Sequence, residues 1–383
     1  MKAILLIGTV EAAFLLLLLT AKKKKTVSDF YLGIIFFLFI LSIGLTYAEI
    51  INSDNGFPFP FIVNLSWLFL FLHGPALWFY ITSFSDQKQS FRLIYLLHFI
   101  PFLVFLVIQY ITFISLPGPE KIELVVTDLF KEKIFYKISV LSIGVSTITY
   151  YVWALKLIQN HRLKLMQNYS KIDEFDLNWL RILIIASLIC YGINVALFNL
   201  DLIFQIASYQ ILMIYTYSFA SVYILVLGYF GLTQGNVFIR INGNSEAVGE
   251  PVFEAKTELQ SESGNSFVPE LLGFMENKKP WLDPELTITR LSEMLDVKVN
   301  YLSGAINSEL NRNFFDFVNN YRIAEFKNQV ISGANSHLSI MGIAYNCGFN
   351  SKASFYRAFK KFEGFSPTDY IQSVSQKSET PEK

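Results

Sequence analysis

Two stretches near the C-terminal end carry polar and basic side chains at helical spacing. The clearer stretch holds Ser351, Lys352, Ser354, Arg357, Lys360 and Lys361. The other holds Asn300, Ser303, Gly304 and Asn307. Arginine and lysine can read guanine edges in the major groove of DNA, and asparagine can read adenine. These ten residues are therefore candidate DNA-binding residues, with Lys360 and Lys361 expected on phosphates, where contacts give affinity without sequence information.

Capping residues around the stretch Asn300–Asn307 predict a pair of short helices. Thr287 is expected to cap one helix, and Asn300 is expected to cap the next. Ser292 is the small residue where the two helices approach, and Asp296 stands in the turn. Aspartate tolerates a left-handed backbone better than most residues, so the turn can form.

The stretch Ser351–Lys361 and the residues before it repeat this pattern with stronger signals. Ser339 is expected to cap a helix over residues 340–346, and Ser351 is expected to cap the next one. Small Ala344 permits close approach, and Gly348 sits where the turn needs a left-handed backbone. Two short helices across such a turn are the helix-turn-helix pattern.

One long helix is predicted between the two pairs, from Asn313 to about Ser332. About 20 residues at a rise of 1.5 Å give a length of roughly 30 Å. Successive major-groove faces on one side of DNA lie about 34 Å apart. One chain can therefore present two reading helices to adjacent grooves.

The region from about Leu282 to Ser373 resembles the DNA-binding domain of AraC/XylS-type transcriptional regulators. The matching residues are Ile343-Ala344, Gly348-Phe349, Phe355, Arg357, Phe359-Lys360-Lys361, Gly364, Ser366-Pro367 and Tyr370. The first helix pair departs from the pattern at Ser292 and Asp296. The resemblance implies a transcription regulator, and it covers only about a quarter of the chain.

The chain before about residue 231 has the composition of a membrane protein. The whole sequence of 383 residues is 53% hydrophobic and only 16% charged, whereas soluble proteins carry about 25% charged residues. Seven segments are long and apolar enough to span a bilayer: Ala3–Thr20, Phe30–Ile51, Phe61–Phe84, Leu93–Ser115, Ile134–Ile158, Trp179–Leu200 and Tyr209–Phe230. We predict an all-α fold, a seven-transmembrane-helix bundle followed by a cytoplasmic all-α domain with two helix-turn-helix units.

Basic residues in the loops predict the orientation. With the N-terminus outside, the inside loops hold Lys22–Lys25, Lys88, Arg92, Arg162, Lys164 and Lys171. Lys121, Lys131 and Lys133, in one outside loop, oppose the trend. Basic residues concentrate in cytoplasmic loops, so we expect a multi-pass protein of the inner cell membrane with a cytoplasmic C-terminal domain.

Composition changes divide the chain into four parts. We expect a transmembrane domain over residues 1–230 and a flexible linker over 231–266. The DNA-binding domain follows over 267–375, and a disordered tail over 376–383. A flexible linker of about 35 residues reaches on the order of 30 Å, which would keep the domain near the membrane.

Polar residues are scarce within the spans. Glu11 is the candidate sensor, because a charge within a bilayer is costly and marks function by default. Glu49 lies near the outer surface, where solvation is expected, and His73-Gly-Pro indicates a helix kink. The last span lacks the lysine that a retinal protein needs, and no internal repeat indicates a transporter.

No catalytic constellation is present, so we expect no enzyme. The two cysteines and four histidines lack metal-ligand spacing, and we expect no metal and no cofactor. The sequence favours a membrane-bound, sequence-specific regulator of transcription, with the spans acting as sensor or anchor. Its expected partners are double-stranded promoter DNA, the lipid bilayer, a second copy in a homodimer, and a small-molecule or membrane signal.

An alternative function remains open. Acidic and basic residues nearly balance from Val268 onward, so a strong electrostatic footprint for DNA is missing. A seven-span receptor whose C-terminal helical domain binds a protein partner would have the same overall pattern.

Overall fold

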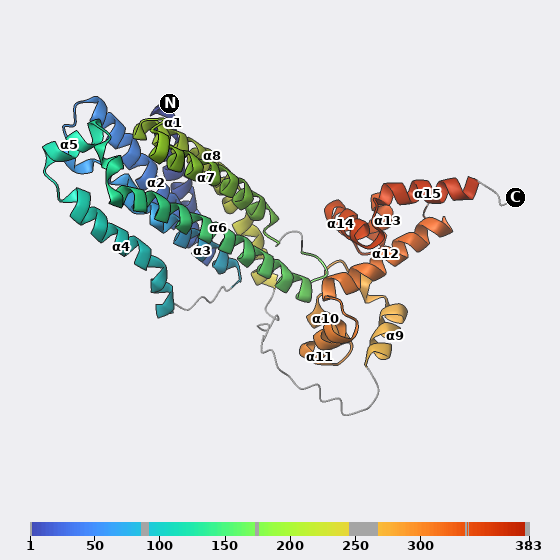
Figure 1. The fold of residues 1–383 in the computed structure, drawn as a ribbon. Helices are drawn as coiled ribbons and strands as arrows, with labels where there is room; N and C mark the ends of the chain where they lie inside the picture. The colour runs from blue at the N-terminus through green and yellow to red at the C-terminus, as the bar shows by residue number, and fades with distance from the viewer. Residues whose placement is uncertain are drawn as a thin grey trace. The chain divides into compact units, whose positions relative to one another are not determined.

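The computed structural model describes residues 2–85, 92–172, 176–244, 267–333, 335 and 337–379. The regular elements are all helices, as predicted, and the described residues form no strand beyond an isolated bridge between Tyr169 and Thr287. The chain divides into two compact units (Figure 1). We call Met1–Gln159 with Leu177–Asn244 the seven-helix unit, and Asn160–Asp176 with Ser245–Lys383 the C-terminal unit.

Among the described residues, seven helical segments are long and apolar enough to cross a membrane, in agreement with the seven predicted. They are α1 (Lys2–Ala21), α2 (Val27–Asp54), Pro60–Phe84 with α3 (Leu70–Ser85), Leu93–Ile114 with α4 (Ile100–Gln109), α6 (Ile134–Asn168), α7 (Asn178–Phe204) and α8 (Tyr209–Asn244). The short helix α5 (Gly118–Val126) follows α4 and was not predicted. The last residues of α6 belong to the C-terminal unit.

These helices are apolar on their outer faces as well as inside. Phe36, Ile184 and Leu227 are fully buried in the core of the unit. Phe14 and Ile182, by contrast, leave 58% and 60% of their surface exposed. A helix that is hydrophobic all round is either enclosed by protein or surrounded by lipid, and the exposed apolar surface favours lipid.

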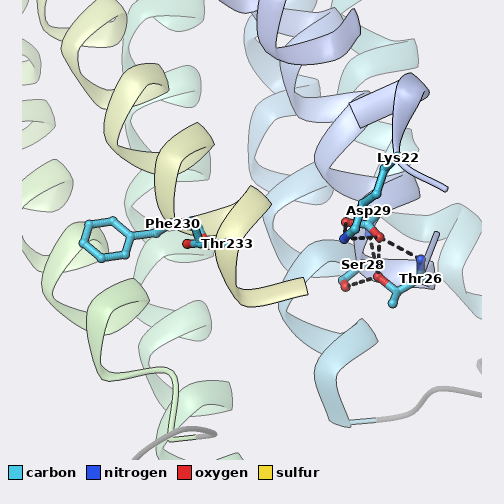
Figure 2. Close-up of polar contacts among 6 residues, drawn as sticks. All are labelled: Lys22, Thr26, Ser28, Asp29, Phe230 and Thr233. Atoms are coloured by element: carbon cyan, nitrogen blue, oxygen red, sulfur yellow. Dashed lines mark hydrogen bonds and ion pairs between the residues drawn. The ribbon is translucent and has the colours of Figure 1, made fainter. Parts of the chain in front are cut away.

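The turn between α1 and α2 is fixed by a capping box. Thr26 accepts a hydrogen bond from the backbone N–H of Asp29, and the Asp29 carboxylate accepts one from the N–H of Thr26. Lys22 Nζ lies 2.8 Å from both carboxylate oxygens of Asp29 (Figure 2). Residues of α8 pack at this end of the bundle, where Gly231 faces the Leu32 side chain of α2. The lysine-containing turn and the end of the seventh span therefore share one end of the unit.

A buried ion pair tethers the connection between the fourth and fifth spans. Lys131 Nζ lies 2.8 Å from an Asp201 carboxylate oxygen and also donates to the Ala207 carbonyl. Asp128 contributes a second carboxylate at 3.4 Å. Lys131 is one of the lysines that oppose the loop-charge trend, and this contact gives it a structural role.

Polar residues within the spans have partners that the sequence did not indicate, and one of them, Glu49, differs from expectation. Glu49 is not simply solvated, because it accepts hydrogen bonds from the backbone N–H and the hydroxyl of Ser66, at 2.8 and 3.0 Å. His73 contacts the Ser42 hydroxyl at 2.9 Å, and Pro75 lies inside α3 as the expected kink requires. In Glu11, one carboxylate oxygen is covered and has no hydrogen-bond partner among the described residues.

Two helices extend past the boundaries drawn from composition. Helix α8 continues to Asn244, so residues 231–244 are helical where a flexible linker was expected. Residues 237, 238, 239 and 241 are all apolar, and the absence of proline lets the helix continue. Residues 245–266 of the expected linker lie outside the described residues. Helix α15 runs to Glu379, into the expected tail.

Short helices build the C-terminal unit around one long helix. They are α9 (Val268–Lys278), the 3-10 turn Pro280–Leu282, α10 (Ile288–Met294), α11 (Val299–Gly304) continued by the π-helical turn Ala305–Glu309, α12 (Phe314–Ser332), α13 (Ile340–Asn346), α14 (Lys352–Glu363) and α15 (Pro367–Glu379). Two hydrophobic cores lie along α12. Its first half, with Phe314 and Val318, packs into one core, and its second half, with Ile323 and Phe326, packs into the other.

Replacing Lys131 by methionine should destabilise the seven-helix unit, because the Asp201 carboxylate, 1% exposed, loses its cation. Removing one partner of a buried pair costs about 3–5 kcal/mol. The control Lys137→Met removes a lysine whose pair with Glu132 is largely exposed, and it should cost less than about 1 kcal/mol. Thermal unfolding in detergent measures both, and equal losses of Tm would contradict the structural role of Lys131.

Candidate nucleic-acid interface

The first helix pair consists of α10 and α11, joined by a turn at Asp296. Thr287 caps α10 and accepts a hydrogen bond from the Arg290 backbone N–H at 3.1 Å, as predicted. Asp296 has the left-handed backbone that the turn requires, with φ of 53°. Asn300 does not cap α11, because that helix begins at Val299 and its N-cap residue is Lys298. Asn300 therefore lies inside the first turn of α11.

The second helix pair consists of α13 and α14, joined by a turn at Gly348. Ser339 caps α13 and Ser351 caps α14, each accepting a hydrogen bond at 3.1 Å. Gly348 has φ of +87°, and a Cβ there would lie 2.5 Å from the Trp281 carbonyl oxygen. Glycine is required at this turn both by the backbone angle and by the close approach of residues 281–282.

Arg322 lies on α12 where the two cores meet, and it is only 2% exposed. Its Nε donates to the Trp281 carbonyl at 2.7 Å, and its Nη2 donates to the Asp283 carbonyl at 2.7 Å. Nη2 also donates to the Ser170 hydroxyl at 3.2 Å. One guanidinium thus joins α12, the approach to the first helix pair, and the segment after α6.

Carbonyl and hydroxyl oxygens surround this buried cation. Burial lowers the pKa of Arg322 to about 10, while the nearby Asp283 and Glu285 carboxylates act to raise it. The side chain therefore stays charged at neutral pH. Phe349, next to the Gly348 turn, places its ring 5.8 Å from the guanidinium carbon, close enough for a cation–π contact.

The candidate DNA-binding residues differ in exposure. The exposed candidates are Asn300, Lys352, Arg357, Lys360 and Lys361, whereas Ser303, Gly304, Asn307 and Ser351 are partly buried. Ser354 is only 3% exposed, so the outward position expected for it is wrong. It shares the inner face of α14 with Phe355 and Ala358, one helical turn before Ala358.

Two of the exposed cations already contact carboxylates within the C-terminal unit. Lys361 Nζ donates to Asp316 of α12 at 2.7 Å. Arg357 Nη1 lies 3.4 Å from the carboxylate of Asp176, which is itself 5% exposed. Lys352 instead lies over the Tyr356 ring at 5.4 Å. The charge of α14 is therefore partly balanced within the unit.

A polar cleft lies between the two helix pairs. It has a volume of about 300 Å³ and is lined by Asn307, Asn311, Arg312, Asn313, Asp316 and Phe362. Asn307 belongs to the first candidate stretch, and its side chain donates to the Ser303 hydroxyl at 3.0 Å. The cleft thus carries hydrogen-bonding groups from the first pair and from α12.

These elements are connected by Arg322, Ser170 and Asn319, whose Nδ2 donates to the Ser170 carbonyl at 3.2 Å. None of the three was predicted from the sequence. A signal for Arg322 was present, because it occupies the apolar stripe Phe314, Val318, Phe326 at four-residue spacing. A charge on a buried face needs partners. The spacing could not name those partners, since Ser170 lies 152 residues away along the chain.

Comparison with known proteins agrees with this geometry. A family model described as a helix-turn-helix domain matches residues 291–373. The chain is 26% identical over 136 residues to the melibiose operon regulatory protein of Escherichia coli strain K12, an alignment covering 34% of this chain and 43% of that protein. It is 30% identical over 90 residues to the uncharacterized HTH-type transcriptional regulator YtdP of Bacillus subtilis strain 168, covering 24% and 11% respectively.

Residues 291–373 form an AraC-type helix-turn-helix domain. The resemblance read from the second helix pair is thereby confirmed for this part of the chain. The chain spans less than half the length of the curated relatives that it matches. No solved structure matches it significantly.

Replacing Gly348 by alanine should destabilise the AraC-type domain far more than the same change at Gly364. Both glycines have nearly the same φ, +87° and +86°, but a Cβ at Gly364 meets nothing within 4 Å. Gly364→Ala should cost about 1 kcal/mol of backbone strain. Gly348→Ala adds a clash worth about 1–3 kcal/mol. Hydrogen exchange of α12 and α13 measures both, and equal protection in the two variants would contradict the tight fit.

Proposed function

We propose that this chain is a membrane-bound, sequence-specific DNA-binding regulator of transcription. The C-terminal unit reads two adjacent major grooves of promoter DNA, with α11 in one groove and α14 in the next. The seven-helix unit lies in the inner membrane as sensor or anchor. Both curated relatives are named as regulators, one of the melibiose operon and one of transcription.

The observation that carries this proposal is the pairing of two helix-turn-helix units on one long helix. Helix α12 has 19 residues, which is a length of about 28 Å. This length is close to the roughly 34 Å between successive major-groove faces. Each half of α12 contributes to the core of one helix pair, so the pairs are held by a common element.

The reading helices supply the chemistry for base and phosphate contacts. Arg357 and Lys352 lie on α14, where they can donate to guanine edges, and Asn300 and Asn307 can pair with adenine. Lys360 and Lys361 lie at the last turn of α14 and are assigned to phosphates. Ser303, Gly304 and Ser351 complete the proposed surface, and the burial of Ser354 excludes it.

Loop charge and packing support the proposed orientation in the membrane. The turn carrying Lys22–Lys25 and the end of α8 share one end of the seven-helix unit. If those lysines face the cytoplasm, the chain leaves the membrane on the side where DNA is. Glu11 stays the candidate sensor of a small-molecule or membrane signal, since one of its carboxylate oxygens has no hydrogen-bond partner in the part of the chain that the structure describes. A homodimer would double the number of reading helices on one promoter.

Reporter fusions test this orientation. A fluorescent protein fused after Lys383 should fluoresce, because it folds in the cytoplasm, and alkaline phosphatase at the same site should be inactive. Phosphatase inserted after Gly56, in the loop between the second and third spans, should be active. The reverse pattern would place the AraC-type domain outside and end the proposal.

Replacing Arg357 by alanine should weaken binding to the preferred DNA by about 1–3 kcal/mol, because a base contact is lost. Binding to unrelated DNA should change little. Lys360→Ala is the matched control on the same helix, and it should weaken binding to all sequences and lower the salt dependence by about one phosphate contact. Titrating both variants with the preferred duplex and with unrelated duplexes measures these changes in affinity. If neither loss appears and the wild type binds no duplex, the domain serves a protein partner instead.

A further inference from the structure

The segment Asn160–Asp176 connects the fifth and sixth spans, yet it belongs to the C-terminal unit. Its first part is the end of α6, which continues without a break from the fifth span to Asn168. From the sequence, this segment was expected to be an inside loop carrying Arg162, Lys164 and Lys171. Its described residues instead contact three parts of the AraC-type domain and the stretch preceding it.

The first contact is a short backbone pairing next to α10. Tyr169 forms an antiparallel bridge with Thr287, the capping residue of α10. The Ser170 backbone N–H and hydroxyl both donate to the Leu286 carbonyl, at 3.3 and 2.7 Å. Ser170 is only 1% exposed, so the segment is packed in rather than lying on the surface.

The second contact reaches the centre of α12. Asn319 Nδ2 donates to the Ser170 carbonyl at 3.2 Å, and Arg322 Nη2 donates to the Ser170 hydroxyl at 3.2 Å. The segment therefore supplies acceptors to the buried cation at the junction of the two helix-turn-helix cores. An acceptor lost from a buried charge is expensive, which gives the docking a free-energy basis.

The third contact involves the reading helix itself. The carboxylate of Asp176 lies 3.4 Å from Arg357 of α14. Lys171 and Glu285 form a second pair at 3.5 Å, and Glu285 also accepts a hydrogen bond at 3.5 Å from Asn350, just before α14. The contact uses Nη1 alone and leaves the other guanidinium donors available. It nevertheless offsets the positive charge of Arg357 and places a negative charge beside the reading helix, which repels the phosphates of DNA.

We propose that the AraC-type domain and the stretch just before it carry a docking surface, formed by Leu286, Asn319, Arg322 and Arg357. Its occupant is the chain's own segment after the fifth span, through the described residues 160–172 and Asp176. Docking and DNA compete for Arg357. The inference rests on the proposed DNA-binding function and adds its regulation: the docked segment lowers affinity for DNA, and its release raises affinity. Because α6 carries the segment directly, a change in the fifth span reaches Arg357 through one continuous helix and a short stretch of chain.

Asp176→Asn tests the competition with the full chain in lipid nanodiscs. The probe is the duplex that the wild type selects from a random-sequence pool, titrated at fixed salt. Removing the carboxylate charge frees Arg357 without changing the shape of the side chain, so affinity should rise several-fold. A full base contact, about 1–3 kcal/mol, sets the upper limit at roughly 150-fold.

Glu270→Gln is the matched control, because it removes one carboxylate charge from the same unit at an exposed residue of α9 that contacts neither the segment nor Arg357. The affinity of this variant should stay near that of the wild type. In an Arg357→Ala background, Asp176→Asn should have no effect. Equal gains in D176N and E270Q would show that the effect comes from overall charge and would overturn the competition.

A disulfide that holds the segment in its docked position is a second test, which applies even if D176N perturbs folding. Partners in an antiparallel bridge have Cα atoms about 4.5–5.5 Å apart, within the range that a disulfide spans. Tyr169→Cys with Thr287→Cys, in a Cys190→Ser background, should bind DNA more weakly when oxidised than when reduced. Each single cysteine variant should bind DNA with the same affinity under oxidising and reducing conditions.

The outcomes separate the inference from the function on which it rests. If the wild type selects a duplex but neither D176N nor reduction of the lock raises affinity, the docking surface is refuted and DNA binding stands. If no variant binds any duplex in either redox state, the proposed function fails, and the inference fails with it.

Discussion

The buried guanidinium of Arg322 is the constraint on which the C-terminal unit depends. A cation that is 2% exposed must have its donors satisfied. Here they are satisfied by oxygens from separate segments, the carbonyls of Trp281 and Asp283 and the hydroxyl of Ser170. Because Trp281 and Asp283 belong to one turn and Ser170 to another segment, one side chain of α12 fixes the arrangement of these three parts. Hydrogen bonds to a charged group are stronger than neutral ones, on the order of 1.5–3 kcal/mol each.

This constraint connects packing to recognition. Arg322 lies between Val318, in the core of the first helix pair, and Phe326, in the core of the second. The Gly348 turn fits against Trp281 and Arg322, so the second pair is built around the same point. Helix α12 sets the spacing of the two reading helices, and the Arg322 contacts hold both pairs on it. Two helices can read adjacent major grooves only if their spacing and orientation are fixed in this way.

Local rules recovered most of the fold from the sequence. Seven spans, the caps Thr287, Ser339 and Ser351, and the left-handed residues Asp296 and Gly348 were predicted, because each depends on neighbours a few residues away. Asn300 failed as a cap because the preceding Lys298 already has the extended backbone of that position. The contacts of Ser170 and Asp176 could not be predicted, since they join segments more than 100 residues apart. No periodicity encodes such a pairing.

The spacing of protected bases on DNA tests the central claim most directly. One C-terminal unit, held together at Arg322, should protect two patches about 10 base pairs apart on the same face of the selected duplex. Inserting about half a helical turn between the patches should abolish specific binding, because the two reading helices cannot rotate independently. Unchanged affinity after that insertion, or protection of a single patch, would contradict the account.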